Sequence, residues 1–287
     1  MTTFIELVRE ISNDFNKYPL VYGHGTDNSW DEALVLVRGI TNLPDDIRLA
    51  DSNISQDDYQ EIKSLASRRI KERIPMPYLL GDVRYVDQNF FCEHGVIIPR
   101  SPIGLLVNEG LKPWISEPPS LIVDVCCGTG CLGILCALSY PLAKVVLVDI
   151  DEKALALARR NIRRFNLEDR VMILAGDLLG ALREESIDLI ISNPPYVSQG
   201  DCDSLADEFK YEPIVGLDGG EDGLYYVSIL LDQAKMVLKK EGLILCEVGQ
   251  SCHALSQKYP GLPFVWIDLP HGGEGVFCLE RSQINVA

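Results

Sequence analysis

The feature that most constrains the fold is an alternation of short apolar runs with helical stretches, which begins at Leu121 and continues almost to the end of the chain. Strands that are apolar on both faces and that alternate with helices indicate a parallel sheet with helices on both sides. The last two apolar runs are joined by a connection too short for a helical crossover, so we expect them to pair antiparallel. The expected strands are 121–126, 144–150, 171–176, 188–192, 243–248, 263–269 and 275–280, and the expected helices are 131–140, 152–166 and 224–239.

The chain before this sheet has a different pattern. Apolar residues recur at helical spacing through the first fifteen residues, and Ser29 and Ser55 fit the caps of two further helices. After Pro75 and Pro77, three short alternating runs, 84–86, 90–91 and 96–98, predict a β-hairpin. The predicted division is 1–76 for a helical domain that selects the substrate, 77–119 for a β-hairpin and linker, and 120–287 for the sheet domain.

The net charge and the cysteines indicate which class of partner and which cellular compartment to expect. The 287 residues carry a formal net charge of −16, which repels phosphate backbones and favours basic protein partners, so we expect no DNA partner. The nine cysteines lack metal-site spacing, which predicts no metal and a reducing cytoplasm. No apolar run is long enough to span a membrane, and the start MTTFIELVRE lacks the features of a signal peptide. The sequence leaves the oligomeric state open.

A glycine-rich loop follows the first strand of the sheet. Gly128, Gly130 and Gly133 match the spacing GxGxxG, in which glycines let a ligand approach the backbone at the start of a helix. Asp149 ends the second strand, where a carboxylate can accept hydrogen bonds from both ribose hydroxyls. On these features alone, a nicotinamide enzyme and an S-adenosylmethionine enzyme are not distinguished.

Three features favour S-adenosylmethionine. Asp124 precedes the first glycine by four residues, and its carboxylate suits a cationic ammonium better than a pyrophosphate. Asp177 follows the third strand, where it is expected to face an adenine amino group. The fourth strand ends in Asn193-Pro194-Pro195-Tyr196. All these positions are carboxyl ends of strands, where ligands bind in such sheets.

The sequence NPPY suggests the reaction. The side-chain oxygen of Asn193 and the carbonyl oxygen of Pro194 are two rigid acceptors, which match the two hydrogens of a planar NH2 group. Holding both N–H groups orients the nitrogen toward a methyl donor and favours the positive charge that develops on it. Tyr196 offers a flat face against which the planar group can pack. We therefore predict that Asn193, Pro194 and Tyr196 are catalytic and that Pro195 also contacts the substrate.

The glycine loop together with NPPY resembles the amino-methyltransferases of adenine, cytosine and glutamine amides. Three further stretches, IPRSP, EFKYEP and CEVGQS, resemble the HemK-like protein-glutamine methyltransferases. Within these, YGHGTDNSWDEA, PRSPIGLLV and LGDVRYVDQNFF resemble the branch that methylates a glutamine of the third large-subunit ribosomal protein. The match covers almost the whole chain. It implies a seven-stranded, Rossmann-like α/β sheet of the class I methyltransferases, with a small helical N-terminal domain and a linking β-hairpin.

The resemblance also implies a cofactor, S-adenosyl-L-methionine, and a set of contacts. One departure is Cys126, because related proteins usually have glycine at this position. The expected cofactor-binding residues are Asp124, Cys126, Gly128, Thr129, Gly130, Asp149, Ile150, Asp177, Leu178 and Asn193.

An acidic insert, residues 197–223, follows NPPY. A basic ribosomal protein, met before or during ribosome assembly, is expected to lie against its carboxylates. Arg100 is predicted to contact the substrate, the cofactor or the insert, and a salt bridge between domains is an equal alternative. His24 is expected to make local hydrogen bonds in a turn. 

Four alternatives stay open at this point. The first is the same reaction on a glutamine of a peptide chain release factor. The second is a nucleic-acid amino-methyltransferase, which would flip its base against Tyr196 but should carry a basic surface. The third is a cofactor-binding subunit without catalysis, and the fourth is a nicotinamide dehydrogenase, which gives no account of NPPY.

Overall fold

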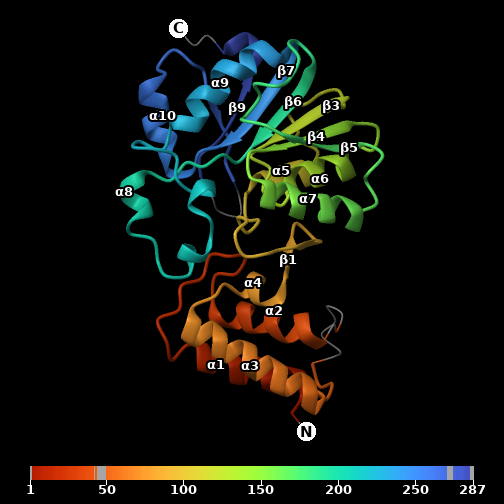
Figure 1. Ribbon diagram of the computed structural model, residues 1–287, viewed down its shortest axis with the longest axis vertical. Helices are drawn as coiled ribbons and strands as arrows, with labels where there is room; N and C mark the ends of the chain where they lie inside the picture. Colours follow the sequence, from red (N-terminus) through yellow and green to blue (C-terminus); the bar gives the residue numbers. More distant parts are fainter. Residues whose placement is uncertain (1, 42, 44–49, 270–273, 285–287) are drawn as a thin grey trace.

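The computed structural model describes residues 2–41, 43, 50–269 and 274–284. A group of helices lies at one end of the molecule and a large sheet at the other, with the β-hairpin between them (Figure 1). Whether 1–76, 77–119 and 120–287 fold as separate units stays a prediction. Among the described residues, no helix is long and apolar enough to cross a membrane.

The N-terminal region consists of α1 (Phe4–Phe15), α2 (Ser29–Thr41), α3 (Gln56–Glu72) and the short α4 (Met76–Leu80). Ser55 caps α3, as predicted, by accepting a hydrogen bond from the Asp58 amide. The predicted cap at Ser29 is wrong. Asn28 accepts from the amide of Asp31 instead, while the hydroxyl of Ser29 is buried 3.0 Å from that of Ser12. The apolar stripes of α1, α2 and α3 share one buried cluster.

The predicted hairpin is confirmed for two of its three runs. Strands β1 (Asp82–Tyr85) and β2 (Gln88–Phe91) pair antiparallel around Val86 and Asp87, which both have positive φ. Such a turn matches the twist of the flanking strands. The third run, 96–98, is not a strand, and it leads into α5 (Ile103–Asn108). Instead of pairing, it contributes to the wall of the cavity described below.

The main sheet has seven strands in the order β5-β4-β3-β6-β7-β9-β8. The first five of these are parallel, and β9 is antiparallel to both of its neighbours, which confirms the predicted architecture. The strands are β3 (Leu121–Val125), β4 (Lys144–Asp149), β5 (Val171–Ala175), β6 (Ile187–Ser192), β7 (Leu238–Glu247), β8 (Val265–Trp266) and β9 (Val276–Glu280).

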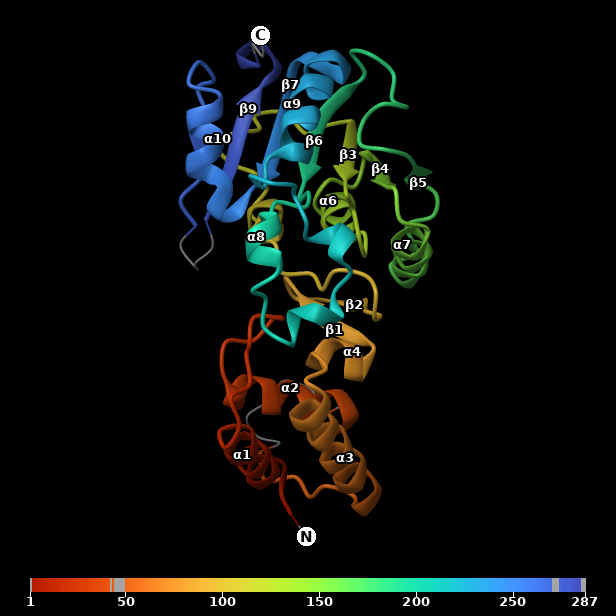
Figure 2. The ribbon, with the colours of Figure 1, turned by 60° about the vertical axis from the view of Figure 1, so that its left-hand side comes forward.

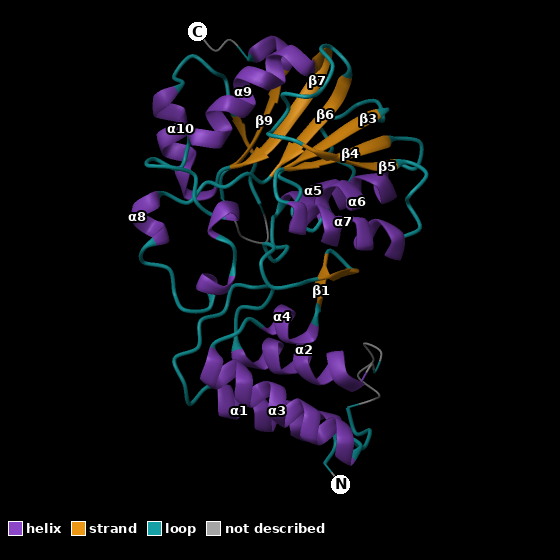
Figure 3. Cartoon of the chain, viewed as in Figure 1, coloured by secondary structure: helices purple, strands orange, loops and turns teal. Residues whose placement is uncertain are grey.

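Helices cover both faces of this sheet (Figure 3). One face packs against α5, α6 (Cys131–Ser139) and α7 (Glu152–Arg164), and the other packs against α9 (Tyr225–Val237) and α10 (Cys252–Lys258). Because successive residues of a strand point to opposite faces, Ile122 joins the first cluster and Val123 the second. The continuous apolar runs in the sequence are thus explained by burial on both sides.

The insert leaves the sheet after β6 and extends toward the N-terminal helices, as Figures 1 and 2 both show. It contains α8 (Gln199–Cys202) and two short 3-10 helices, η2 (Phe209–Tyr211) and η3 (Ile214–Gly216). Its path places it between the helical region and the carboxyl ends of the parallel strands.

Candidate active site

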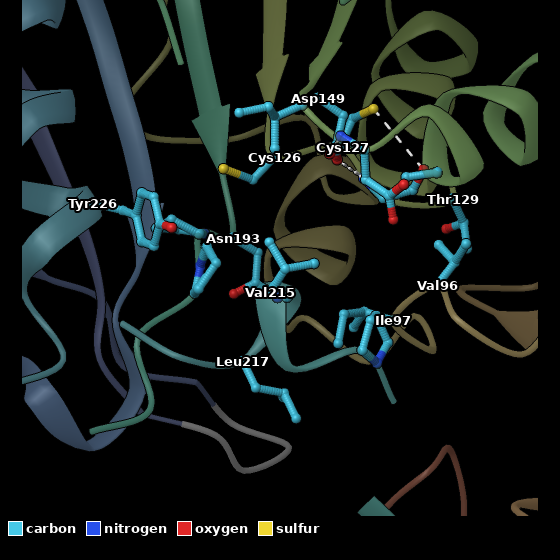
Figure 4. Close-up of a pocket in the computed structure, with 18 of the residues that line it drawn as sticks. Val96, Ile97, Cys126, Cys127, Thr129, Asp149, Asn193, Val215, Leu217 and Tyr226 are labelled. Carbon is cyan, nitrogen blue, oxygen red and sulfur yellow. Dashed lines mark hydrogen bonds between the residues drawn. The ribbon is translucent and has the colours of Figure 1, made fainter. Parts of the chain in front are cut away.

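A cavity of about 300 Å³ opens at the carboxyl ends of β3, β4, β5 and β6. Its wall comes mainly from five parts of the chain: the glycine loop, the residues just after β4, β5 and β6, the linker 96–101, the insert, and the start of α9. In Figure 4, Asn193 and Tyr226 lie on one side of the cavity, opposite Thr129 and Val96. The parallel topology brings together segments that are far apart in the sequence.

The glycine loop requires its glycines for two different reasons. Gly128 has a φ of 53° and Gly130 a φ of 77°, a region that side chains rarely adopt. At Gly133 the reason is packing, because a Cβ atom there would lie 2.2 Å from the Cδ2 atom of Leu147. The loop therefore turns tightly, and α6 approaches β4 closely.

Cys126 shares this left-handed conformation, with a φ of 58°. Its side chain lines the cavity, and burial raises the pKa of its thiol, which stays protonated. The backbone of the loop thus keeps its shape with cysteine in place. The left-handed conformation costs a residue with a Cβ atom about 1–2 kcal/mol.

Asp149 follows the loop at the end of β4 and lines the cavity. Its carboxylate accepts hydrogen bonds from the amide of Gly128, at 2.8 Å, and from the amide of Asp151, at 2.9 Å. Burial raises the pKa of this carboxyl group. The next residue, Ile150, is an apolar side chain 64% exposed at the edge of the same cavity.

Asp124 lies behind the loop rather than in the cavity wall. It is 1% exposed, and its Oδ2 atom accepts a hydrogen bond of 2.8 Å from the amide of Gly133. Its Oδ1 atom is buried without a partner among the described residues, and burial raises the pKa of the group to about 8. The cavity lining does not support the direct ammonium contact that we expected for Asp124. Its observed contact holds the start of α6 against β3.

Three other predicted cofactor residues do line the cavity. Asp177 is exposed at its edge, and Leu178 is buried with a φ of 52°. Thr129 is buried, and its carbonyl oxygen accepts a hydrogen bond of 2.9 Å from the Asn161 side chain. These residues come from the loops after β5 and β3, so the sheet brings them to one edge.

The four residues of NPPY line the cavity as a continuous stretch. The Oδ1 atom of Asn193 is buried and has no hydrogen-bond partner among the described residues. Leaving such an acceptor unpaired is unfavourable by about 1–3 kcal/mol, so it marks a place where a ligand donor fits. Pro194 and Pro195 are buried beside it. The hydroxyl of Tyr196 donates to the Glu247 carboxylate at 2.6 Å.

Two of the acids in the insert are not available to a substrate, contrary to expectation. Glu208 is 1% exposed and accepts hydrogen bonds from Arg69, Arg73 and the amide of Val21. All three donors belong to the helical region or the turns beside it. The ion pairs therefore hold the insert against the N-terminal part of the chain.

Glu212 makes the second anchor of the insert. Burial opposes its ionisation, but the facing His24 and Arg100 lower its pKa to about 2. Arg100 binds both carboxylate oxygens, at 2.6 and 2.9 Å, and the Nε2 atom of His24 lies 3.5 Å away. His24 also packs on Phe209, with ring centroids 4.3 Å apart. The prediction of purely local contacts for His24 was wrong, and Arg100 contacts the insert.

Several residues of the site were not predicted. Tyr226 and Val215 line the cavity, and Glu247 binds Tyr196. The stretch CEVGQS, which contains Glu247, was the only sequence signal for it. The apolar character of Val215 and Tyr226 gave no signal, because such residues are common in any core. No cluster of side chains suited to a metal ion occurs among the described residues.

Comparison with known proteins gives two curated relatives that share almost the whole chain. A "Ribosomal protein uL3 glutamine methyltransferase" of Bordetella pertussis is 36% identical over 289 residues, covering 99% of this chain and 97% of the relative. A protein of the same name from Francisella tularensis is 34% identical over 286 residues, covering 98% and 91%. A family model described as "Methyltransferase small domain" matches residues 111–211.

Solved structures agree on the fold. Two structures of the hMettl16 catalytic domain in complex with MAT2A 3'UTR hairpins have TM-scores of 0.52 and 0.58. The first covers 84% of this chain and 85% of its own at 16% identity, and the second covers 86% and 92% at 13% identity. At such low identity the likeness supports the architecture alone.

Proposed function

The chain belongs to the family of ribosomal protein uL3 glutamine methyltransferases, and on this premise we propose that it transfers a methyl group from S-adenosyl-L-methionine to the side-chain amide nitrogen of a glutamine in uL3. The observation that carries the proposal is the buried, unpaired Oδ1 atom of Asn193 in the wall of the cavity. A primary amide supplies the donor that this acceptor lacks.

The residues of the cavity fit the cofactor. Positive φ angles in the loop 126–130 leave room for a ligand at the backbone, and Asp149 offers a carboxylate at the end of β4. The exposed side chain of Ile150 suits the face of an adenine ring, and Asp177 suits its amino group. When bound, S-adenosylmethionine supplies an electrophilic methyl group on a positively charged sulfur.

The acceptor side of the cavity orients the amide. Asn193 Oδ1 and the carbonyl oxygen of Pro194 accept its two N–H groups, and among the described residues no hydrogen bond to that carbonyl is seen. Two fixed acceptors favour the positive charge that grows on nitrogen, which loses its proton after the transfer. Tyr196 offers its ring to the flat amide group.

The substrate itself is a basic protein by this proposal. A net charge of −16 favours encounter with a basic chain and opposes binding to nucleic acid, so we place the reaction before or during ribosome assembly, in the cytoplasm. The free thiols of all nine cysteines are consistent with a reducing compartment. We propose that the partner lies against the solvent-exposed acids of the insert, which are Asp201, Asp203, Asp207, Glu221 and Asp222.

The test is transfer of label from S-adenosylmethionine to purified uL3. Wild type should label a single glutamine, and Asn193→Ala should lower the rate about 100- to 1,000-fold, because one acceptor at the reacting nitrogen is lost. Asn89→Ala, at an exposed position of β2, serves as the matched control and should match wild type. Absence of label on uL3 with the wild-type enzyme contradicts the proposal, and label on a release factor instead identifies the alternative substrate.

A further inference from the structure

We propose that the stretch 246–251, CEVGQS, forms a cradle for Tyr196, in which Glu247, Gly249 and Ser251 are positioning residues for methyl transfer. The inference rests on the proposed function, because it concerns the tyrosine that would pack against the substrate amide. The stretch follows the end of β7 and is the neighbour of NPPY across the sheet, since β6 and β7 are paired in parallel.

Every second residue of this stretch contacts Tyr196. The Oε1 atom of Glu247 accepts the hydrogen bond of the tyrosine hydroxyl at 2.6 Å. A Cβ atom on Gly249 would lie 2.6 Å from the Cε2 atom of the tyrosine, so the ring packs directly on this glycine. The hydroxyl of Ser251 donates to the carbonyl oxygen of Tyr196 at 3.1 Å. The ring, the hydroxyl and the backbone carbonyl of Tyr196 are thus each contacted by a different residue.

The backbone of Tyr196 also lies close to two glycines of the insert. A Cβ atom on Gly219 would lie 2.7 Å from the Cα atom of Tyr196, and one on Gly223 would lie 2.3 Å from its carbonyl oxygen. Close contacts with bare backbone leave no room for another position of the chain at Tyr196. What remains to be fixed is the direction of the side chain, and the hydrogen bond to Glu247 sets it.

Glu247 cannot serve the substrate directly. Its second oxygen, Oε2, accepts a hydrogen bond of 2.5 Å from the hydroxyl of Ser101, and the residue is 6% exposed. It is also absent from the lining of the cavity. Because Glu247 is buried outside the cavity lining and its Oε1 atom binds the hydroxyl of Tyr196, it acts on the site through Tyr196.

Ser101 connects Glu247 to the linker. Its carbonyl oxygen accepts a hydrogen bond of 2.5 Å from the hydroxyl of Tyr85, which in turn accepts one of 3.1 Å from the amide of Gly104. The chain of contacts therefore runs from the β-hairpin through Ser101 and Glu247 to Tyr196. With its hydroxyl engaged in this chain, Tyr196 presents its ring to the cavity and does not act as a proton donor to the substrate.

The experiment combines kinetics with a double-mutant cycle. Glu247→Ala should lower kcat for uL3 methylation about 30-fold, because the hydroxyl of Tyr196 loses a charged acceptor. The dissociation constant of S-adenosylmethionine should change less than about twofold, because Glu247 does not touch the cavity. Glu247→Gln, which keeps an acceptor oxygen, should restore kcat to within about threefold of wild type.

The cycle uses Tyr196→Phe as the second change. In the Tyr196→Phe background, Glu247→Ala should lower kcat no more than about threefold further, because the two residues act as one unit. Equal losses from Glu247→Ala in both backgrounds would overturn the inference, as would a loss of cofactor affinity as large as the loss of kcat. Glu241→Ala, at an exposed position on the same strand, is the control and should match wild type.

A measurement that does not depend on methyl transfer separates this inference from the proposed function. Amide hydrogen exchange at Tyr196 and Val197 should be faster in Glu247→Ala than in wild type and Glu247→Gln. Unchanged exchange in Glu247→Ala would overturn the cradle even if uL3 is methylated. If wild type leaves uL3 unlabelled while exchange responds as expected, the proposed substrate is wrong and the cradle stands.

Discussion

The two walls of the cavity are built on different principles. In the glycine loop the decisive contacts are close in the sequence: Gly133 donates to Asp124 nine residues away, and Gly128 donates to Asp149 twenty-one residues away. In the insert, the carboxylate of Glu208 binds Arg69, which is 139 residues away. One buried acid, Asp124, has no cation beside it among the described residues, whereas the buried acids of the insert are paired with arginines.

This difference shows that the two walls depend on different parts of the molecule. The loop keeps its shape through backbone conformation and close packing within the sheet domain. The insert has few buried apolar side chains of its own and depends on ion pairs with the helical region and the linker. We therefore expect the N-terminal helices to act on the reaction at least in part by holding this wall.

The largest effect should come from breaking the ion pairs of the insert. Arg69 is 1% exposed, and it binds Glu32 at 2.7 Å and Glu208 at 3.1 Å. Arg69→Leu removes the arginine that binds buried Glu32 and one of the two arginines that bind buried Glu208, so the free energy of unfolding should fall by about 3–5 kcal/mol in urea denaturation. Arg68→Leu, at the exposed neighbouring position, is the control. A loss below about 1 kcal/mol for Arg69→Leu would show that the pairs do not hold the insert.

The two walls should respond to pH in opposite directions. The pKa of Asp124 is raised from 3.8 to about 8, so its contribution to stability is full below pH 3.8 and is lost as pH rises toward 8. The pKa of Glu212 is lowered from 4.5 to about 2, so its contribution is full above pH 4.5 and is lost as pH falls toward 2.

Urea unfolding without added cofactor, measured from pH 3 to pH 9, separates these contributions. Asp124→Asn should reduce the decrease in the free energy of unfolding that occurs as pH rises, and Glu212→Gln should reduce the decrease that occurs as pH falls. Each reduction should be on the order of 2 kcal/mol. Each variant should leave the other side as in wild type. An alkaline loss that persists in Asp124→Asn would assign it to another group.

A smaller effect is expected from filling the space at the glycine loop. In Gly133→Ala, the added methyl group would lie 2.2 Å from the Leu147 side chain and 3.1 Å from Asp124 Cβ. The free energy of unfolding should fall by about 1–3 kcal/mol. Because α6 would shift away from β4, affinity for S-adenosylmethionine should also weaken, measured by calorimetry. Gly200→Ala, where no atom lies within 4 Å of the added methyl group, should change neither quantity.

The smallest effect is expected at Cys126. Glycine removes the strain of the left-handed conformation but makes the unfolded chain more flexible, and these two effects offset each other to within about 1 kcal/mol. Cys126→Gly should therefore leave the free energy of unfolding and the affinity for S-adenosylmethionine close to those of wild type. A large gain in affinity would show that the cysteine side chain obstructs the cofactor.

The sequence predicted well those features that depend on local pattern. The apolar runs and their spacing correctly indicated a parallel sheet in which the last strand of the chain, β9, runs antiparallel to its neighbours. The positions of Gly128, Asp149 and Asn193 at strand ends correctly placed them on one cavity. Such features follow from the period of a strand, from the φ angles open to glycine and from the rule that parallel strands end at one edge.

Prediction failed where a side chain depends on a distant partner. Ser29 has the pattern of a cap, but its hydroxyl is buried against Ser12. Glu208 and Glu212 have the sequence pattern of surface acids, but both are buried. The run at 96–98 has the pattern of a strand, but it forms part of the cavity wall instead. In each case the local pattern was compatible with more than one environment.

By itself, then, the sequence determined the alternation of the sheet, the left-handed turns of the loop and the residues that reach its carboxyl edge, because backbone geometry fixes these within a few residues. Only the tertiary structure decided that the insert is held by Arg69 and Arg100, that Glu247 holds Tyr196, and that Asp124 lies behind the cavity. The physical reason is that the ionisation and hydrogen bonding of a buried polar group depend on which groups the fold brings to it.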